Sequence, residues 1–305
     1  ADMKKVLFIV NPTAGKERMK RYLMSVLDLF TKADWDVTVH ITQAALDATN
    51  VAQKQGADFD MIVCSGGDGT LSETISGMTR LYRPPVLGYI PAGTTNDFAS
   101  SLQISSNTMK AAQTVIDGHP QPVDIGFFCE ERTFVYVAAF GAFTEVSYMT
   151  PQEKKNLLGH QAYMLEGVKS LTNLKSYTMT VESDEMTLEG DFIFGMVTNT
   201  ISVGGFKGLV ASNVRLDDGL FEVLLIRTPK TPMELTNILS SMILKEEQSE
   251  YVYRFKTSRL TIHAEEPVDW VLDGEFGGAK MDAEIVNLQK RISIISGIKE
   301  IAEGR

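Results

Sequence analysis

The residues best suited to chemistry form a glycine-rich stretch, Ser65-Gly66-Gly67-Asp68-Gly69-Thr70, which follows the apolar run 61–64. A strand that ends in glycines and leads into a helix brings free backbone N–H groups and a helix N-terminus to one point, and such a point binds phosphate. Glycine is needed there because a Cβ would hinder positive φ and the close approach of the main chain to a phosphate oxygen. Glycine and aspartate are also ordinary turn residues, so a tight turn without a ligand stays open for this stretch alone.

Two further turn segments follow apolar runs of the same kind. Asn11-Pro12-Thr13-Ala14-Gly15-Lys16 comes after the run 6–10, and Pro91-Ala92-Gly93-Thr94-Thr95-Asn96-Asp97 comes after the run 86–90. Continuous apolar runs are typical of strands that are buried on both faces of a parallel sheet. Because the carboxyl ends of parallel strands share one edge, where open α/β sheets bind ligands, we expect the three loops to meet at one site.

The elements that must position these loops alternate along the chain. Helical patterns cover 22–30, 46–55, 70–78 and 107–116, and a further strand pattern covers 36–41. Alternation with short connections favours a doubly wound parallel sheet with helices on both faces. We therefore expect an N-terminal α/β nucleotide-binding domain over residues 1–125.

From residue 126 the pattern is dominated by strands. They are expected at 133–140, 177–182, 191–199, 220–227, 254–263, 268–272 and 285–295, with helical stretches at 160–175 and 232–247. This pattern predicts a mostly antiparallel β-sandwich domain over residues 126–295. We expect the last residues, 296–305, to pack back on the first domain.

Composition excludes several classes of protein. Of the 305 residues, 44% are hydrophobic and 22% are charged, which is typical of a globular chain. The net charge of −10 argues against a nucleic-acid partner, because such binding depends on a broad basic surface. Cys64 and Cys129 form neither a disulfide framework nor a metal-type cluster with the four histidines. No apolar run approaches the roughly 18–20 residues that cross a bilayer, so we expect a soluble, cytoplasmic protein.

Two common nucleotide motifs are absent from the sequence. The P-loop pattern G-x-x-x-x-G-K-[ST] does not occur, since Ala14-Gly15-Lys16-Glu17 lacks the earlier glycine and the hydroxyl residue. No G-x-G-x-x-G follows the first strand, which disfavours a dinucleotide dehydrogenase. A nucleotide bound here needs another arrangement.

Five ordered motifs supply such an arrangement. They resemble the signatures of the diacylglycerol kinase catalytic-domain superfamily, and most closely those of the soluble bacterial lipid kinases of the diacylglycerol kinase type. The Gly-Gly-Asp-Gly-Thr element alone is shared with NAD kinases and 6-phosphofructokinases, so the resemblance depends on the whole set and implies a first domain of the phosphofructokinase and NAD kinase type. The motifs span nearly the whole chain: Asn11-Pro12-Thr13-Ala14-Gly15-Lys16, Gly66-Gly67-Asp68-Gly69-Thr70, Pro91-Ala92-Gly93-Thr94-Thr95-Asn96-Asp97-Phe98, Leu216-Asp217-Asp218-Gly219-Leu220-Phe221 and Leu272-Asp273-Gly274-Glu275.

Phosphoryl transfer requires positioned substrates, neutralised charge and a base for the attacking hydroxyl. Hard oxygen ligands suit Mg²⁺, and the resemblance implies that Asp68, Asp97 and Asp124 arrange ATP-bound magnesium directly or through water. A helix-cap or turn role stays open for Asp97 and Asp124. The residues expected to bind ATP are Asn11, Pro12, Thr13, Ala14, Gly15, Lys16, Thr42, Gly66, Gly67, Gly69, Thr70, Thr94, Asn96, Asp97 and Asp124.

On the family pattern the second domain supplies the base. The resemblance implies that Glu275, assisted by Asp273, deprotonates the lipid hydroxyl, with Asp68 as the third catalytic carboxylate. An exposed hairpin turn is the alternative for Asp273-Gly274-Glu275. A base opposite the ATP edge requires the domains to face each other across a cleft. The resemblance also implies a structural Mg²⁺ at Asp218 and the main-chain carbonyls near Arg215 and Leu220.

One position departs from the family pattern. Some diacylglycerol kinases carry a functional lysine in the helix that aligns with Tyr163-Met164-Leu165-Glu166-Gly167, and Glu166 stands at its place. Lys154, Lys155 or Lys169 could replace it by reaching phosphate or an anionic membrane surface. The identity of the acceptor lipid therefore stays open.

These features predict an ATP- and Mg²⁺-dependent lipid kinase that phosphorylates the hydroxyl of diacylglycerol, or of a related membrane lipid, to phosphatidic acid or an analogue. Its partners would be the lipid substrate and, transiently during turnover, the membrane surface. An NAD kinase and a non-catalytic nucleotide- or lipid-binding regulator of the same fold are the alternatives. The sequence does not define the oligomeric state, and a homodimer stays open.

Overall fold

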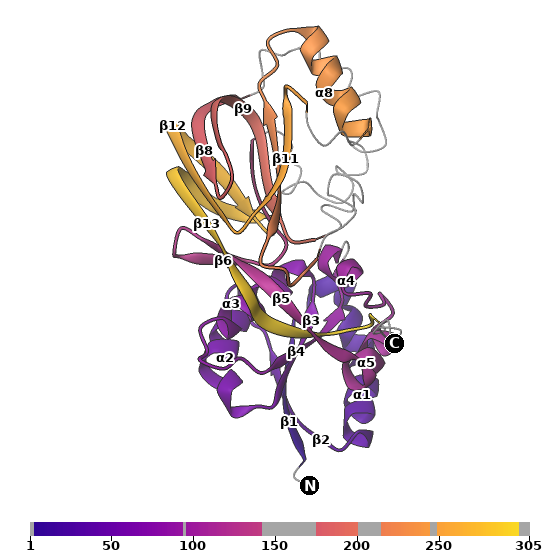
Figure 1. The fold of residues 1–305 in the computed structure, drawn as a ribbon. Helices are drawn as coiled ribbons and strands as arrows, with labels where there is room; N and C mark the ends of the chain where they lie inside the picture. The colour runs from indigo at the N-terminus through magenta and orange to yellow at the C-terminus, as the bar shows by residue number, and fades with distance from the viewer. Residues whose placement is uncertain (1–2, 94–95, 142–174, 201–214, 245–248, 299–305) are drawn as a thin grey trace, which may run out of the picture.

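The computed structural model describes residues 3–93, 96–141, 175–200, 215–244 and 249–298. These residues form two bodies, with the N-terminal third of the chain in one and most of the remaining strands in the other (Figure 1). The first body is an α/β layer structure and the second is rich in β-strands. The predicted fold class is therefore confirmed.

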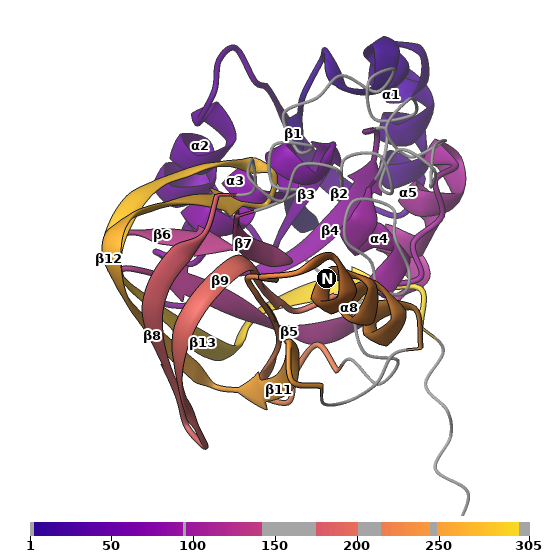
Figure 2. The ribbon, with the colours of Figure 1, turned by 90° about the horizontal axis from the view of Figure 1, so that it is seen from above.

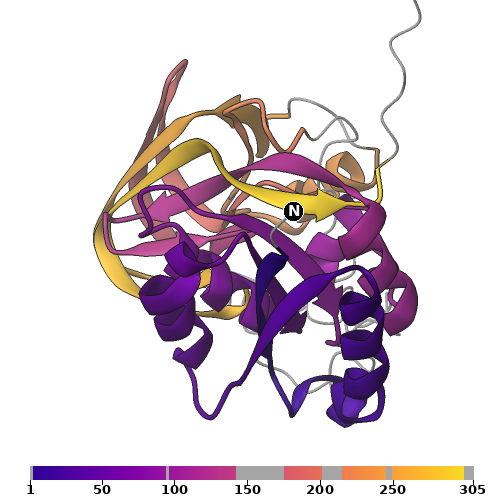
Figure 3. The same ribbon diagram turned by 90° about the horizontal axis from the view of Figure 1, so that it is seen from below.

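The first body is built on four parallel strands in the order β2-β1-β3-β4. Helices α1 and α5 lie on one face of this sheet, and α2 and α3 lie on the other (Figure 3). Cover on both faces explains why the residues of β3 are buried throughout. The elements are β1 (Lys4–Val10), α1 (Ala14–Lys32), β2 (Trp35–Ile41), α2 (Asp47–Gln55), η1 (Gly56–Asp58), β3 (Met61–Gly66), α3 (Asp68–Met78), β4 (Val86–Pro91), α4 (Asp97–Ser101) and α5 (Thr108–Asp117).

The strand order creates a switch point between β1 and β3. The chain passes from β1 to β2 on one side, and then continues from β2 to β3 on the other side of β1. Ligands of open α/β sheets bind outside the carboxyl ends of the strands at such a point. Asn11 N donates to Ser65 O at 2.9 Å, and Ala92 N donates to Gly66 O at 2.8 Å. The loops after β1, β3 and β4 therefore meet at one edge.

The second body consists of antiparallel strands. Strands β7, β9, β8 and β12 pair in a closed ring. Trp270 is wholly buried in its core, and its ring lies 5.1 Å from that of Phe140 and 5.2 Å from that of Phe128. The elements are β6 (Arg132–Phe134), β7 (Val137–Gly141), β8 (Tyr177–Ser183), β9 (Thr187–Thr198), β10 (Phe221–Arg227), α8 (Pro232–Leu244), β11 (Val252–Thr257) and β12 (Arg259–Leu272). In the described part of the chain, no helix is both long and apolar enough to cross a membrane.

Two strands connect the bodies. β13 (Glu275–Ser296) pairs with β12 in the second body, then with β5 (His119–Phe128), and at Ile294 with β4 of the first body (Figures 1 and 2). Gly297 N donates to Leu102 O, so the chain has returned to the first body at this point. Residues 299–305, most of the segment expected to pack back, lie outside the described residues. The division into 1–125 and 126–295 stays a proposal, because β5 and β13 run through both bodies.

Some strands differ from the sequence pattern. The expected strand 133–140 is split at Val135 and Tyr136, whose N–H groups donate hydrogen bonds to the carboxylate of Asp273 and not to a neighbouring strand. The expected strand 254–263 is split at Ser258, whose N–H and hydroxyl both donate to Asp184. β5 is absent from the expected strands because its first half contains two prolines, which weaken a strand pattern. The expected helix 160–175 lies outside the described residues, except at its last position.

Gly77 allows α3 to pack against α2. A Cβ at this position would overlap the carbonyl oxygen of Thr49 and would lie 2.9 Å from the Cβ of Ala52. We expect Gly77→Ala to lower the free energy of unfolding by about 2 kcal/mol, because the two helices would have to separate. Ser76→Ala in the same helix is the matched control and should change it by less than about 0.5 kcal/mol. Thermal and urea unfolding would measure both changes, and equal stability of Gly77→Ala and the wild type would contradict this packing.

Candidate active site

The glycine-rich loop lies between β3 and the N-terminus of α3, where the other two loops pack on it. A Cβ on Gly66 would overlap the side chain of Thr70, and one on Gly67 would lie 3.4 Å from Gly93 Cα. Gly15 has a φ of +56°, and a Cβ there would overlap the carbonyl oxygen of Ala92. The glycines therefore allow three loops to touch and leave the first N–H groups of α3 facing this edge.

Asn11 and Thr70 hold the first loop against the glycine-rich loop. Asn11 Nδ2 donates to Thr70 Oγ1 at 3.0 Å, and Asn11 Oδ1 accepts from the N–H and hydroxyl of Thr13. Pro12, Thr13 and Ala14 are at least partly exposed along the same edge. Thr42 follows β2, and its N–H donates to Val10 O at 2.9 Å, so this residue also lies at the edge.

Asn96 shapes the third loop through its side chain. Its Nδ2 donates to Gly93 O, and its Oδ1 accepts from Gly93 N, both at 2.9 Å. These two bonds close the turn between Gly93 and Asn96. Thr94 and the side chain of Lys16, both expected near the phosphates, lie outside the described residues.

Asp68 and Asp97 form an acidic pair at this edge. Asp68 Oδ2 accepts from Asp97 N at 3.1 Å, whereas Asp68 Oδ1 is buried without a hydrogen-bond partner. Burial raises the pKa of Asp68 to about 6, and the charges of Asp97 and Asp273 add to the rise. A buried carboxylate oxygen without a donor is satisfied well by a cation. The pair therefore fits a hard cation such as Mg²⁺.

Asp124 makes its hydrogen bonds with a different part of the chain from Asp68 and Asp97. It is in the middle of β5 and accepts from Gly219 N and Lys290 N, both at 2.7 Å, and from Asn287 Nδ2 at 3.3 Å. Among the described residues no three His, Cys, Asp or Glu side chains converge closely enough to hold a metal ion. The expectation that Asp124 acts with Asp68 and Asp97 on ATP-bound magnesium, directly or through water, therefore stays a prediction.

The Asp217-Asp218-Gly219 turn forms a second polar centre beside Asp124. Asp218 Oδ1 accepts from Leu220 N at 3.1 Å, and Arg215, which is exposed, forms an ion pair with Asp217 at 3.7 Å. Burial raises the pKa of Asp124, and the charge of Asp218 adds to the rise. Two amide oxygens in the neighbourhood are buried without partners, Asn199 Oδ1 and Asn287 Oδ1. Unsatisfied oxygens next to two carboxylates fit a cation at this turn.

Asp273 joins the two bodies. Its carboxylate accepts from Val135 N at 2.7 Å, Tyr136 N at 3.0 Å and Val137 N at 3.1 Å, and from Ser72 Oγ of α3 at 2.6 Å. Burial raises the pKa of Asp273, and the hydrogen bond from Ser72 is the largest opposing effect. The gap between β6 and β7 thus supplies three donors, and the helix of the glycine-rich loop supplies the fourth.

Glu275 lies directly against the glycine-rich loop. It is exposed, and its Oε1 is 3.6 Å from the position that a Cβ would take on Gly69. Arg132 Nη1 donates to the carbonyl of Phe276 at 2.7 Å and so braces the start of β13. The structure therefore brings the expected base of the second body to the expected phosphate loop of the first.

Three residues at this junction escaped the sequence analysis. Ser72 lies one helical turn after Asp68 and reaches Asp273. Glu73 Oε1 accepts a hydrogen bond from Leu46 N at 3.0 Å. Burial raises the pKa of Glu73, and the charge of Glu275 adds to this rise. The third residue is Tyr136. In the sequence, Ser72 and Glu73 could have been found by their spacing from the glycines, and Tyr136 by its polar hydroxyl within an apolar run.

Tyr136 shows how closely the acidic residues gather. Burial raises the pKa of its hydroxyl well above the ordinary value, and the charges of Asp273, Asp68, Asp97 and Glu275 all add to this rise. On one side of the site, the N-terminus of α3 can bind an anion. On the other side lies the exposed carboxylate of Glu275, and the acids Asp68 and Asp97 can bind a cation.

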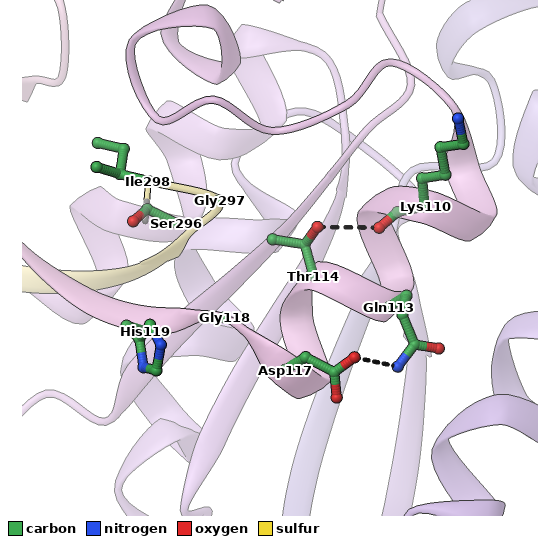
Figure 4. A pocket seen from close by; sticks show the side chains of 9 residues that line it. All are labelled: Lys110, Gln113, Thr114, Asp117, Gly118, His119, Ser296, Gly297 and Ile298. Carbon is green, nitrogen blue, oxygen red and sulfur yellow. Dashed lines mark hydrogen bonds between the residues drawn. The ribbon is translucent and has the colours of Figure 1, made fainter. Parts of the chain in front are cut away.

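A cavity of about 490 Å³ lies away from this junction. It opens where α5 ends, β5 begins and β13 ends (Figure 4). Its lining contains none of the expected site residues, so it is not the site described above. The lining residues are Lys110, Gln113, Thr114, Asp117, Gly118, His119, Ser296, Gly297 and Ile298.

Comparison with known proteins agrees with the geometry. The model of the diacylglycerol kinase catalytic domain matches residues 5–128, and the model described as the YegS C-terminal NAD kinase beta sandwich-like domain matches residues 138–291. A diacylglycerol kinase of Bacillus subtilis is 37% identical over 305 residues, which cover 99% of each chain. One of Staphylococcus epidermidis is 34% identical over 296 residues, which cover 96% of this chain and 92% of the relative.

A solved structure shows the same fold. A protein of Bacillus anthracis, provisionally assigned as a diacylglycerol kinase, superposes with a TM-score of 0.81 at 27% identity, covering 97% of this chain and 96% of the other. The family predicted from five motifs is thereby confirmed. On the sequence identity over its full length, the chain belongs to the diacylglycerol kinase family, a family of phosphotransferases.

Proposed function

We propose that the protein is an ATP- and Mg²⁺-dependent lipid kinase, which transfers the γ-phosphate to the hydroxyl of diacylglycerol or of a related membrane lipid. The product would be phosphatidic acid or an analogue. The position of the Glu275 carboxylate against Gly69 carries this proposal, because it sets an acceptor base next to a donor loop. The family of the chain supports it.

On the donor side, the backbone of Gly67, Gly69 and Thr70 would bind the ATP phosphates at the N-terminus of α3. Asp68 and Asp97 would hold Mg²⁺, and the unpartnered Oδ1 of Asp68 supports this assignment. When bound, Mg²⁺ neutralises charge on the phosphates during transfer. Asn11 and Asn96 would act indirectly, because their side chains shape the loops.

On the acceptor side, Glu275 would accept the proton of the lipid hydroxyl. The hydroxyl oxygen then bonds to the γ-phosphorus as the bond between that phosphorus and the ADP oxygen breaks. Asp273 would assist by position, because its two oxygens already accept four hydrogen bonds. Its φ of +50° and the following Gly274 direct the chain back towards the glycine-rich loop.

The second polar centre would hold a structural Mg²⁺ at Asp218 and at the carbonyls of Arg215 and Leu220. The unpartnered amide oxygens of Asn199 and Asn287 support a cation in this neighbourhood. Asp124 would belong to this centre and would brace β5 against β13 through Lys290 N.

The acceptor would be taken from a bilayer, so we also propose transient binding to the membrane surface. The segment expected to form part of the acceptor side, including Lys154, Lys155, Glu166 and Lys169, lies outside the described residues. Diacylglycerol and a related lipid therefore both remain within the proposal.

Glu275→Gln tests the base. Glutamine keeps the size of the side chain but cannot accept the proton, so we expect kcat with short-chain diacylglycerol to fall by about 10²- to 10⁴-fold. ATP affinity by calorimetry should stay unchanged. Glu266→Gln, an exposed acid of β12, is the control and should keep wild-type turnover. Undiminished turnover by Glu275→Gln would remove this residue from the chemistry.

Ser72→Ala tests the hydrogen bond between the bodies. Three donors to Asp273 remain, so the protein should fold, but the glycine-rich loop and the base would no longer be tied together. We expect kcat to fall about tenfold, the effect of one lost charge-assisted hydrogen bond. Ser72→Thr retains the hydroxyl and should restore most of the activity. A Ser72→Ala enzyme with wild-type kcat would show that the bond has no part in turnover.

Asp68→Asn tests the proposed cation site through the pH dependence of protein stability. The pKa of Asp68 is raised from 3.8 to about 6, so its contribution to stability is present at low pH and is lost as pH rises through 6. In metal-free buffer at pH 8, Asp68→Asn should therefore be more stable than the wild type, by up to about 3 kcal/mol, while kcat collapses. Mg²⁺ should narrow this difference by stabilising the wild type. Unfolding curves that change identically with pH in both proteins would contradict the assignment.

A further inference from the structure

Tyr136 is held at the junction by its backbone. It lies between β6 and β7 and is 7% exposed. Its N–H donates to Asp273 Oδ1, and its carbonyl accepts from Asn199 N at 3.1 Å and from Thr198 Oγ1 at 2.6 Å. Both backbone polar groups are thus bound, and the direction of the side chain is set.

The hydroxyl of Tyr136 lies next to the turn that carries the base. It is 3.9 Å from the position that a Cβ would take on Gly274, the residue between Asp273 and Glu275. Within the described residues this hydroxyl makes no hydrogen bond, although the side chain is more than nine-tenths buried. The hydroxyl oxygen is not one of the fully buried polar atoms that lack a partner, so it keeps contact with solvent and is free to donate to a ligand at this turn.

The chemistry of the surroundings indicates which kind of ligand group this is. Asp68, Asp97 and Glu275 only accept hydrogen bonds when ionised, so they repel the carbonyl oxygens of an ester. Of the neighbouring donors in the described chain, Ser72 Oγ already binds Asp273, and Arg132 Nη1 binds the carbonyl of Phe276. The neutral phenol of Tyr136 is therefore suited to donate to a substrate oxygen beside Glu275.

We propose that Tyr136 is a specificity-determining residue, whose hydroxyl donates a hydrogen bond to an ester carbonyl oxygen next to the reacting hydroxyl of the acceptor lipid. This inference rests on the proposed function and narrows its substrate class. The site prefers an alcohol flanked by an ester to an alcohol flanked by an ether. The preference arises because an ether oxygen offers the phenol hydroxyl a poorer acceptor than an ester carbonyl does.

A substrate and mutant cycle tests this contact on the full chain. Wild type, Tyr136→Phe and Tyr177→Phe are assayed in detergent micelles with a short-chain diacylglycerol and with its dialkyl ether analogue. Tyr177 is a buried tyrosine of β8 and serves as the matched control. We expect Tyr136→Phe to lower kcat/KM about tenfold for the diester and less than about twofold for the diether. The KM for ATP and the Tm should stay at wild-type values, and Tyr177→Phe should match the wild type with both lipids.

The outcomes separate the two proposals. If the wild type phosphorylates neither lipid, the proposed function fails, and the assignment of Tyr136 fails with it. If the wild type is active but Tyr136→Phe loses the same factor with both lipids, or loses nothing, only the assignment of Tyr136 is overturned. If Tyr136→Phe loses the same factor of kcat/KM with both lipids and also needs more Mg²⁺, the hydroxyl of Tyr136 acts on Asp68 Oδ1 and not on the lipid, and the assignment is overturned.

Discussion

The buried carboxylate of Asp273 is the interaction on which the candidate site depends. It gathers three consecutive N–H groups from the break between β6 and β7, and one hydroxyl from the helix of the glycine-rich loop. Without it those N–H groups would be buried and unsatisfied, at a cost of about 1–3 kcal/mol each. The same carboxylate begins the turn that sets Glu275 against Gly69. One side chain therefore stabilises the second body and aligns it with the first.

The concentration of acids at this junction opposes folding and favours ligand binding. Burial raises the pKa of both Asp68 and Asp273, but the two are stabilised differently. Asp273 is satisfied by four protein donors, whereas Asp68 keeps one buried oxygen without a partner. A protein that leaves such an oxygen unsatisfied gains stability when a cation binds. Asp68 thus keeps an oxygen that a cation could satisfy, whereas the carboxylate of Asp273 is already satisfied by the protein.

The sequence predicted the parts of the fold that local patterns determine. Apolar runs followed by glycine-containing turns predicted β1, β3 and β4, and the edge where their loops meet follows from the geometry of parallel sheets. The hydrogen-bond partners of Asp124 could not be predicted in this way, because Gly219 and Lys290 are 95 and 166 residues away. The break in the strand at Tyr136 could not be predicted for the same reason. Its backbone N–H donates to the carboxylate of Asp273, which comes 137 residues later in the chain. Periodicity reports local burial, and it does not report which distant polar group a backbone N–H will meet.

Transfer of phosphate to a lipid alcohol is the central claim, and γ-labelled ATP tests it most directly. The protein is incubated with labelled ATP, Mg²⁺, a total lipid extract and NAD⁺ in one reaction, and the labelled products are separated and identified. The account predicts label in a lipid that migrates as phosphatidic acid or a close analogue, and none in NADP⁺. Label in NADP⁺, or no labelled lipid from an extract that contains diacylglycerol, would contradict it.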